Sequence, residues 1–143
     1  MKSIYSITIA IALTVSFGCI SGNCKNLSSA NISKVNVKKV CDVKKNGVKA
    51  VLAQAKLYNP IAVKHQVEFM RFGATASEYI RATSEAIKNN SSTANVKQKK
   101  KVVKMKLEYT AWRACTFSIR ALQQENEANM HYKKAIPGDG YKY

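Results

Sequence analysis

The chain has 143 residues, and its 24 Lys+Arg against 8 Asp+Glu give a formal net charge of +16. This length excludes a multidomain protein, and a hydrophobic fraction of 46% is that of an ordinary globular domain. Most of the excess cations are lysine, a hydrated point charge. The excess of lysine favours diffuse attraction to an anionic surface over sequence-specific recognition of nucleic-acid bases. A role in keeping the protein soluble is the alternative interpretation of this charge.

Residues 1–18 have the pattern of an export signal peptide. Lys2 supplies a short positive region, and an uncharged, almost entirely apolar run follows from Ile4 to Phe17. This run is short for a membrane span, and no other uncharged apolar run occurs in the chain. We therefore expect a secreted or periplasmic protein whose mature chain has no transmembrane segment; a first core helix is the alternative. Three cleavage positions fit the small residues here: after Gly18, Ser21 or Gly22.

Residues 19–41 are rich in Asn, Ser and Lys and are expected to form an irregular N-terminal arm. Gly18-Cys19 partly matches the motif at which bacterial lipoproteins are lipidated, so anchoring at Cys19 is an alternative to free secretion. The arm holds three of the four cysteines of the chain, which are Cys19, Cys24, Cys41 and Cys115.

The cysteines predict disulfide stabilisation in an oxidising compartment. A bond between Cys41 and Cys115 would staple the arm to the rest of the fold, and Cys19 would then pair locally with Cys24. Four cysteines allow three connectivities, and the sequence does not choose among them. A buried free Cys115 is the alternative. No two cysteines have the C-x-x-C spacing of a zinc site, so we expect no metal.

The spacing of apolar residues predicts three helices, over 42–58, 60–88 and 94–130. Two long apolar stripes joined by a polar turn at 89–93 predict an antiparallel helical hairpin, and the first helix would cover its open side. The expected fold is therefore all-α: a small antiparallel helical bundle, a long hairpin plus one shorter helix, comprising a helical domain over 42–130. Residues 131–143 contain Pro and two Gly, and we expect a flexible C-terminal tail.

Aromatic residues fall within these stripes and are expected in the core. His65, Phe69, Phe72 and Tyr79 step at helical spacing along 60–88, with Phe72 near the middle. Trp112 and Phe117 lie on the stripe of the last predicted helix. Core packing is favoured over a surface on which bases would stack.

A run of lysines opens the last predicted helix and is the candidate binding surface. In a helix, Lys99, Lys106, Arg113 and Arg120 would form one basic line, because they are seven residues apart. The candidate residues for binding an anionic partner are Lys97, Lys99, Lys100, Lys101, Lys104, Lys106, Arg113 and Arg120.

Catalysis is not expected. The chain has only two histidines, His65 and His131. A small secreted hydrolase such as a ribonuclease would need both at one phosphate, whereas one is expected in the core and the other near a loose tail. No Ser/His/Asp arrangement, phosphate loop or cofactor motif is present, so we expect neither a cofactor nor a small-molecule substrate.

The sequence thus predicts a secreted, non-enzymatic, cationic helical protein, effector- or toxin-like. It would bind an anionic partner through a lysine-rich helix face. That partner would be a membrane or cell-wall surface, a nucleic acid or an acidic host protein. A cell-envelope accessory protein or lipoprotein is the alternative, and a hydrolase comes third.

Overall fold

The computed structural model describes residues 32–135. The expected signal peptide, most of the arm with Cys19 and Cys24, and residues 136–143 of the expected tail lie outside this range. In chain order, the elements are α2 (Val37–Val40), α3 (Val43–Asn46), α4 (Val48–Lys64), β1 (Met70–Arg71), β2 (Ala74–Thr75), α5 (Ala76–Lys88), β3 (Thr93–Gln98), β4 (Lys101–Lys106) and α6 (Leu107–Ala135).

The prediction of an all-α fold is wrong, because the structure has two small antiparallel sheets beside its helices. Strand β1 pairs with β2, and β3 pairs with β4. Two-residue turns join the strands, Phe72-Gly73 in the first hairpin and Lys99-Lys100 in the second. Both hairpins replace segments that were expected to be helical.

The predicted helix over 94–130 begins only at Leu107, because residues 93–106 form the β3–β4 hairpin. Ala94 and Val96 point inward and are buried, while Asn95 and Lys97, which alternate with them along the strand, are exposed. This alternation has the two-residue period of a strand. Val96 and Val103 suggested a helical stripe, but they are cross-strand partners in the sheet.

The predicted helix over 60–88 is also wrong, because the chain leaves helix α4 after Lys64 and starts α5 at Ala76. Phe72 and Gly73 have φ angles of 54° and 77°, which no α-helix contains. Helix α5 then begins with a side-chain cap, since the Thr75 hydroxyl accepts the Glu78 N–H at 3.3 Å. Thr75 and Glu78 have the spacing of a capping box.

The predicted helix over 42–58 is divided, and it extends further than expected. Gly47, with φ 78°, separates α3 from α4. Pro60 was expected to start a new helix but lies inside α4. Proline lacks a backbone N–H, so α4 loses one hydrogen bond at Pro60. The neighbouring residues Tyr58, Asn59 and Ala62 are nevertheless buried against other elements, which holds this part of the chain in the helix. Tertiary packing of α4 against α5 and α6 therefore outweighs the local break.

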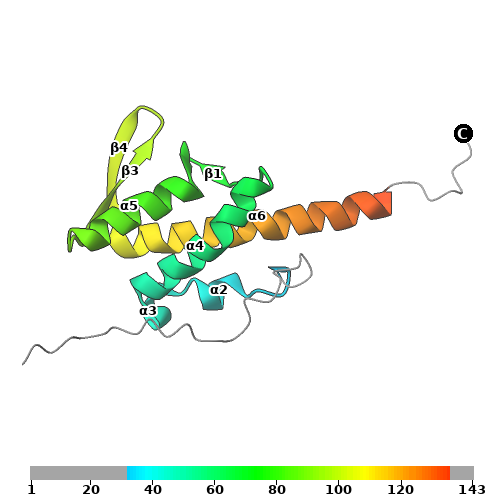
Figure 1. Ribbon diagram of the computed structural model, residues 1–143, viewed down its shortest axis with the longest axis horizontal. Helices are drawn as coiled ribbons and strands as arrows, with labels where there is room; N and C mark the ends of the chain where they lie inside the picture. The colour runs from blue at the N-terminus through cyan, green and yellow to red at the C-terminus, as the bar shows by residue number, and fades with distance from the viewer. Residues whose placement is uncertain (1–31, 136–143) are drawn as a thin grey trace, which may run out of the picture.

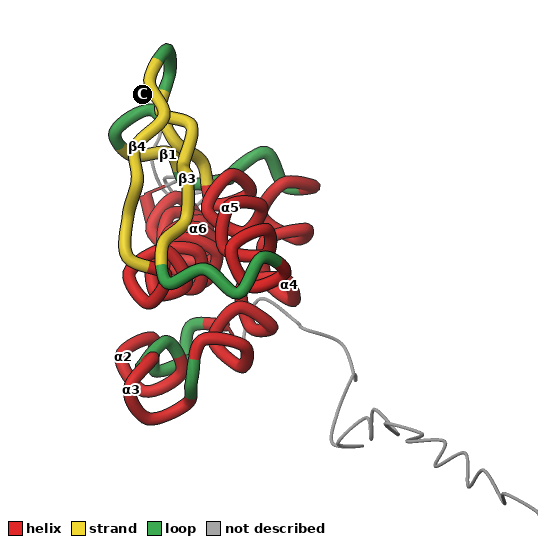
Figure 2. Tube along the Cα trace, turned by 90° about the vertical axis from the view of Figure 1, so that its left-hand side faces the viewer, coloured by secondary structure: helices red, strands yellow, loops and turns green. Residues whose placement is uncertain are grey.

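Helix α6 is the rod around which the other elements are arranged (Figure 1). Helix α4 crosses it, and α5 packs along its first half. The two hairpins lie together on one side of the helices, and α2 and α3 lie on the opposite side (Figure 2). Helix α6 also continues to Ala135, past the expected helix end at 130.

A disulfide between Cys41 and Cys115 joins the end of α2 to the first half of α6. The sequence left three connectivities open, and this pairing belongs to the one in which the arm is stapled to the rest of the fold. Both cysteines are fully buried, and 74 residues separate them in sequence. The bond therefore closes most of the described chain into one covalent loop.

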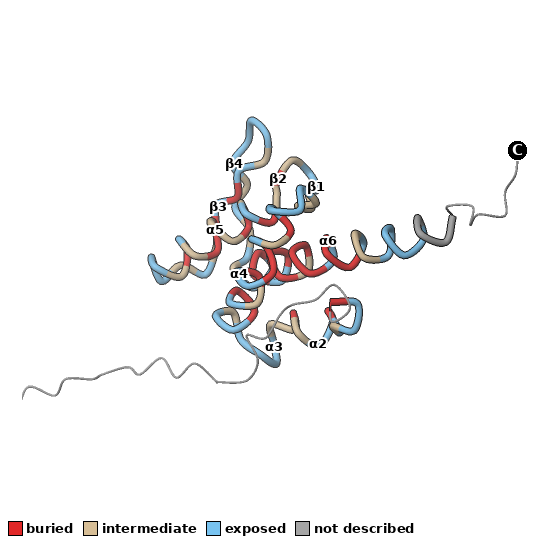
Figure 3. Tube along the Cα trace, turned by 45° about the vertical axis from the view of Figure 1, so that its right-hand side comes forward, coloured by how far each residue is buried: buried red, intermediate tan, exposed pale blue. Residues whose placement is uncertain are grey.

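The core forms where α4, α5 and β3 meet the first half of α6 (Figure 3). Phe117 of α6 lies at its centre. Its ring centroid is 4.9 Å from that of Phe69 and 5.6 Å from that of Tyr79, which meets it edge-on. The predicted inner stripe of α6 is buried, as at Ala111, Ala114, Ser118 and Leu122.

Three residues expected in the core lie instead at the surface. Phe72 is 63% exposed and Trp112 is 40% exposed. The His65 side chain, at the end of α4, is 43% exposed. The prediction for Phe72 and His65 is wrong because the chain is not helical between Lys64 and Ala76, so these residues do not lie on a helical stripe that faces the core.

Candidate functional site

The six lysines of the predicted site lie on the β3–β4 hairpin, and all are exposed. The prediction that they occupy a helix face is therefore wrong. Directly opposed residues in an antiparallel pair project from the same face, so the outer face carries Lys97, Lys104, Lys106 and the apolar Val102. Lys99 and Lys100 form the turn, and Lys101 opens β4. We call this β3–β4 hairpin, residues 93–106, the lysine hairpin.

The positive charge of the lysine hairpin is not neutralised within the described part of the chain. The salt bridges of residues 32–131 join Glu78 and Glu85 to Arg81, and Glu125 to His65. No lysine side chain in that range lies within 4.0 Å of a carboxylate. Like charges this close repel one another, so an anionic partner would lower the electrostatic energy of the hairpin.

The ion pair of Glu78 and Arg81 fixes the lysine hairpin to α5. A carboxylate oxygen of Glu78 accepts the backbone N–H of Lys97 at 2.6 Å. Arg81 donates to the other Glu78 oxygen at 2.7 Å and to the carbonyl of Asn95 at 3.3 Å. These side chains pair with backbone groups on the outer edge of β3, which would otherwise be an open strand edge.

The pKa of Glu78 is lowered from its usual value of 4.5. Burial of the carboxyl opposes ionisation, but hydrogen bonds from Arg81 and the Lys97 N–H, together with their positive charge, outweigh it. A carboxyl whose folded-state pKa is lowered contributes stability above its unfolded pKa, and that contribution is lost as the pH falls through the folded value.

Replacing Glu78 by glutamine is therefore expected to lower the free energy of unfolding by about 2 kcal/mol at pH 7. The difference from the wild-type protein should shrink as the pH falls below 4.5, the usual pKa of this carboxyl. Urea unfolding at a series of pH values measures both effects. Glu85→Gln is the matched control, because Glu85 also binds Arg81 but its side chain is 55% exposed. Equal losses in the two variants would contradict the role of Glu78 in holding β3.

Arg113 was predicted to lie on a basic surface line, but it is only 8% exposed. Its guanidinium carbon lies 5.0–5.8 Å from the ring centroids of four aromatic residues, which are Phe72, Tyr109, Trp112 and Phe117. Arg113 Nε also donates to the Tyr109 hydroxyl at 2.7 Å. Aromatic faces and one hydroxyl thus stabilise a buried cation that, among the described residues, has no carboxylate partner.

Arg120 is exposed on α6, two helical turns after Arg113. The predicted line through Lys99, Lys106, Arg113 and Arg120 does not exist, because the first two residues are not helical. The structure thus groups the six lysines on one hairpin and leaves Arg120 on a separate element.

Sequence reasoning missed a group of exposed apolar residues beside the lysines. Met70 and Phe72 in the β1–β2 hairpin are each 63% exposed, and Val102 on β4 is 65% exposed. Tyr109 and Trp112 follow on α6, with ring centroids 5.7 Å apart. The sequence does carry one signal for the first hairpin, because a glycine follows Phe72 inside an apparently helical pattern.

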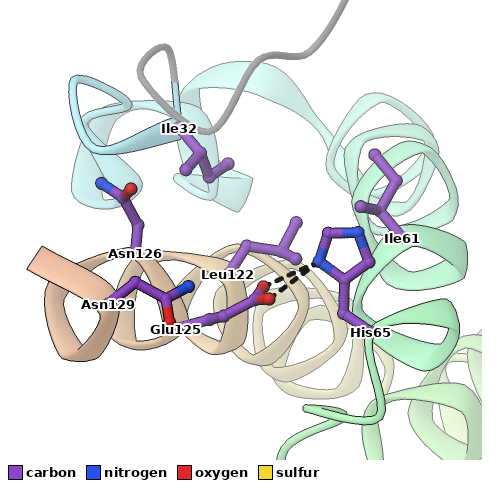
Figure 4. A pocket seen from close by; sticks show the side chains of 7 residues that line it. All are labelled: Ile32, Ile61, His65, Leu122, Glu125, Asn126 and Asn129. Atoms are coloured by element: carbon purple, nitrogen blue, oxygen red, sulfur yellow. Dashed lines mark hydrogen bonds and ion pairs between the residues drawn. The ribbon is translucent and has the colours of Figure 1, made fainter. Parts of the chain in front are cut away.

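A second candidate site is a small pocket between α4 and α6, with a volume of about 70 Å³. His65 and Glu125 both line it, and His65 Nδ1 lies 2.9 Å from a carboxylate oxygen of Glu125 (Figure 4). Ile32, Ile61 and Leu122 supply apolar walls. His131 does not line this pocket, and it lies about 9 Å further along α6 than Glu125. The two histidines of the hydrolase alternative are thus not brought together here.

The described residues contain no group of three His, Cys, Asp or Glu side chains that could hold a metal ion. None of the helices within residues 32–135 is long and apolar enough to cross a lipid bilayer. Comparison with protein-family models finds no matching family, and comparisons with curated proteins and with solved structures find no match.

Proposed function

We propose that this is a secreted, non-enzymatic protein that binds an anionic partner through the lysine hairpin. One observation carries the proposal: six exposed lysines share one short hairpin, and none of them has a carboxylate partner among residues 32–131. A binding partner rich in phosphate, sulfate or carboxylate groups would displace counterions from this surface.

The hairpin is suited to this role because its position is fixed before binding. Ala94 and Val96 are buried in the core, and the Glu78–Arg81 pair holds the edge of β3. The lysine side chains remain flexible, but their backbone does not have to be ordered when a partner arrives. Less conformational entropy is then lost on binding. The Cys41–Cys115 disulfide supports an extracytoplasmic location, where such bonds persist.

Changing Lys99, Lys100, Lys101 and Lys106 to glutamine is expected to weaken binding to immobilised heparin by about tenfold or more at physiological salt. The slope of log affinity against log salt concentration should become shallower, because fewer counterions are released. Affinity measured at several salt concentrations reports both quantities.

The matched control changes four exposed lysines outside the lysine hairpin, Lys34, Lys45, Lys49 and Lys56, to glutamine. Both variants lose the same net charge. If they lose affinity equally, net charge alone explains the binding and the lysine hairpin has no special role.

A further inference from the structure

The ends of the two hairpins lie side by side. The backbone N–H of Lys99 in the second turn donates to the carbonyl of Gly73 in the first turn at 3.1 Å. Gly73 is required here, since a Cβ atom at this position would meet Lys99 Cγ at 2.5 Å and its φ is 77°. We call these joined ends, residues 70–73 and 99–102, the double tip.

The double tip exposes three apolar side chains that the fold does not need in the core. Met70, Phe72 and Val102 are each at least 63% exposed. Phe72 is also held at φ 54°, a left-handed conformation that bulky residues rarely adopt and that Asn and Gly accept more readily. A turn selected for stability alone would place Asn at this position.

The double tip also carries four exposed cations: Arg71, Lys99, Lys100 and Lys101. The two segments of the double tip contain no acidic residue. Apolar side chains that are exposed among cations are typical of surfaces that enter the interface of an anionic lipid bilayer. The apolar groups reach the acyl boundary there, and the lysines remain at the headgroups.

We propose that the double tip docks on an anionic membrane surface, with Met70, Phe72 and Val102 entering the interface and the lysines contacting the lipid headgroups. This inference rests on the proposed function, and it names the anionic partner as a lipid bilayer. Two of the three apolar residues are aliphatic, so they have no ring on which a nucleic-acid base could stack. The ring of Phe72 already has Arg71 at 4.9 Å and Arg113 at 5.8 Å from its centroid. A lipid surface therefore fits the double tip better than a single-stranded nucleic acid does.

The test is flotation with vesicles of phosphatidylcholine alone and of equal parts phosphatidylcholine and phosphatidylglycerol. The exported chain, without the apolar run of residues 1–18, is expected to float with the anionic vesicles only. The variant Phe72→Asn/Val102→Thr should bind them about tenfold more weakly, since less apolar surface leaves water. Asn suits the left-handed φ of residue 72, and Thr keeps the β-branched shape of residue 102, so the fold should be retained. Heparin affinity and its salt slope should not change in this variant.

The matched control is Leu57→Gln/Val63→Thr, which removes two exposed apolar residues of α4, away from the double tip. It should bind vesicles as the wild-type protein does.

Unchanged vesicle binding by the double-tip variant would overturn the docking proposal and leave the proposed function standing. Binding of heparin but of neither vesicle would do the same. Tighter binding to a single-stranded oligonucleotide than to vesicles, weakened by Phe72→Asn, would assign the surface to nucleic acid instead. Failure to bind heparin, vesicles and the oligonucleotide would overturn the proposed function itself.

Discussion

Replacing both Cys41 and Cys115 by alanine is expected to lower the free energy of unfolding by about 4 kcal/mol. The bond joins residues that are 74 apart, so its loss frees a long loop in the unfolded chain. Because both positions are completely buried, alanine also leaves unfilled space around α2 and α6. Denaturant unfolding under non-reducing conditions measures this difference.

The control for the disulfide is the response to a reducing agent. Reduction should shift the unfolding midpoint of the wild-type protein toward that of the alanine variant. Any further shift that a reductant causes in the variant itself would come from cysteines other than this pair. A variant that unfolds at the wild-type midpoint would show that the bond contributes nothing to stability.

Truncating Phe117 to alanine is expected to destabilise the fold by about 3–5 kcal/mol. The Phe117 ring contacts Phe69 and Tyr79 in the core. The guanidinium carbon of Arg113 also lies 5.1 Å from the centroid of the Phe117 ring. Its removal creates a cavity and takes away one of the aromatic faces that stabilise a buried charge. Thermal and denaturant unfolding both report the loss.

The matched comparison is Phe72→Ala, the same chemical change at a residue that is 63% exposed. We expect it to alter stability by less than about 1 kcal/mol. This reverses the expectation from sequence, in which Phe72 was a central core residue. A loss at Phe72 as large as the loss at Phe117 would mean that the β1–β2 hairpin is packed more tightly than the structure shows.

Several parts of the fold follow from local pattern alone. Ala111, Ala114 and Ser118 are three and four residues apart, which is the spacing of one face of a helix. These residues are buried in α6. The polar segment 89–93 was expected to be a turn, and residues 89–92 do separate α5 from β3, which begins at Thr93. In both cases one regular structure satisfied the pattern, so no long-range contact was needed to choose it.

The lysine hairpin shows why the rest was missed. Residues 93–106 place apolar side chains at positions that fit a helical stripe and also fit an alternating strand. Six lysines hide the alternation, because charged residues occupy most of the remaining positions. Burial of Ala94 and Val96 and the edge bonds from Glu78 and Arg81 favour the strand. Those bonds come from another element, which a local pattern does not show.

The sequence by itself determined that the chain is strongly cationic, that six of its lysines cluster between 97 and 106, and that an amphipathic helix follows them. These properties depend on composition and on neighbours along the chain. Only the tertiary structure decided that Phe72 is exposed, that Arg113 is buried among aromatic rings, and that the turn at Lys99 meets the turn at Gly73. Each of these outcomes depends on contacts between elements distant in sequence, because the burial of a side chain is set by what packs over it.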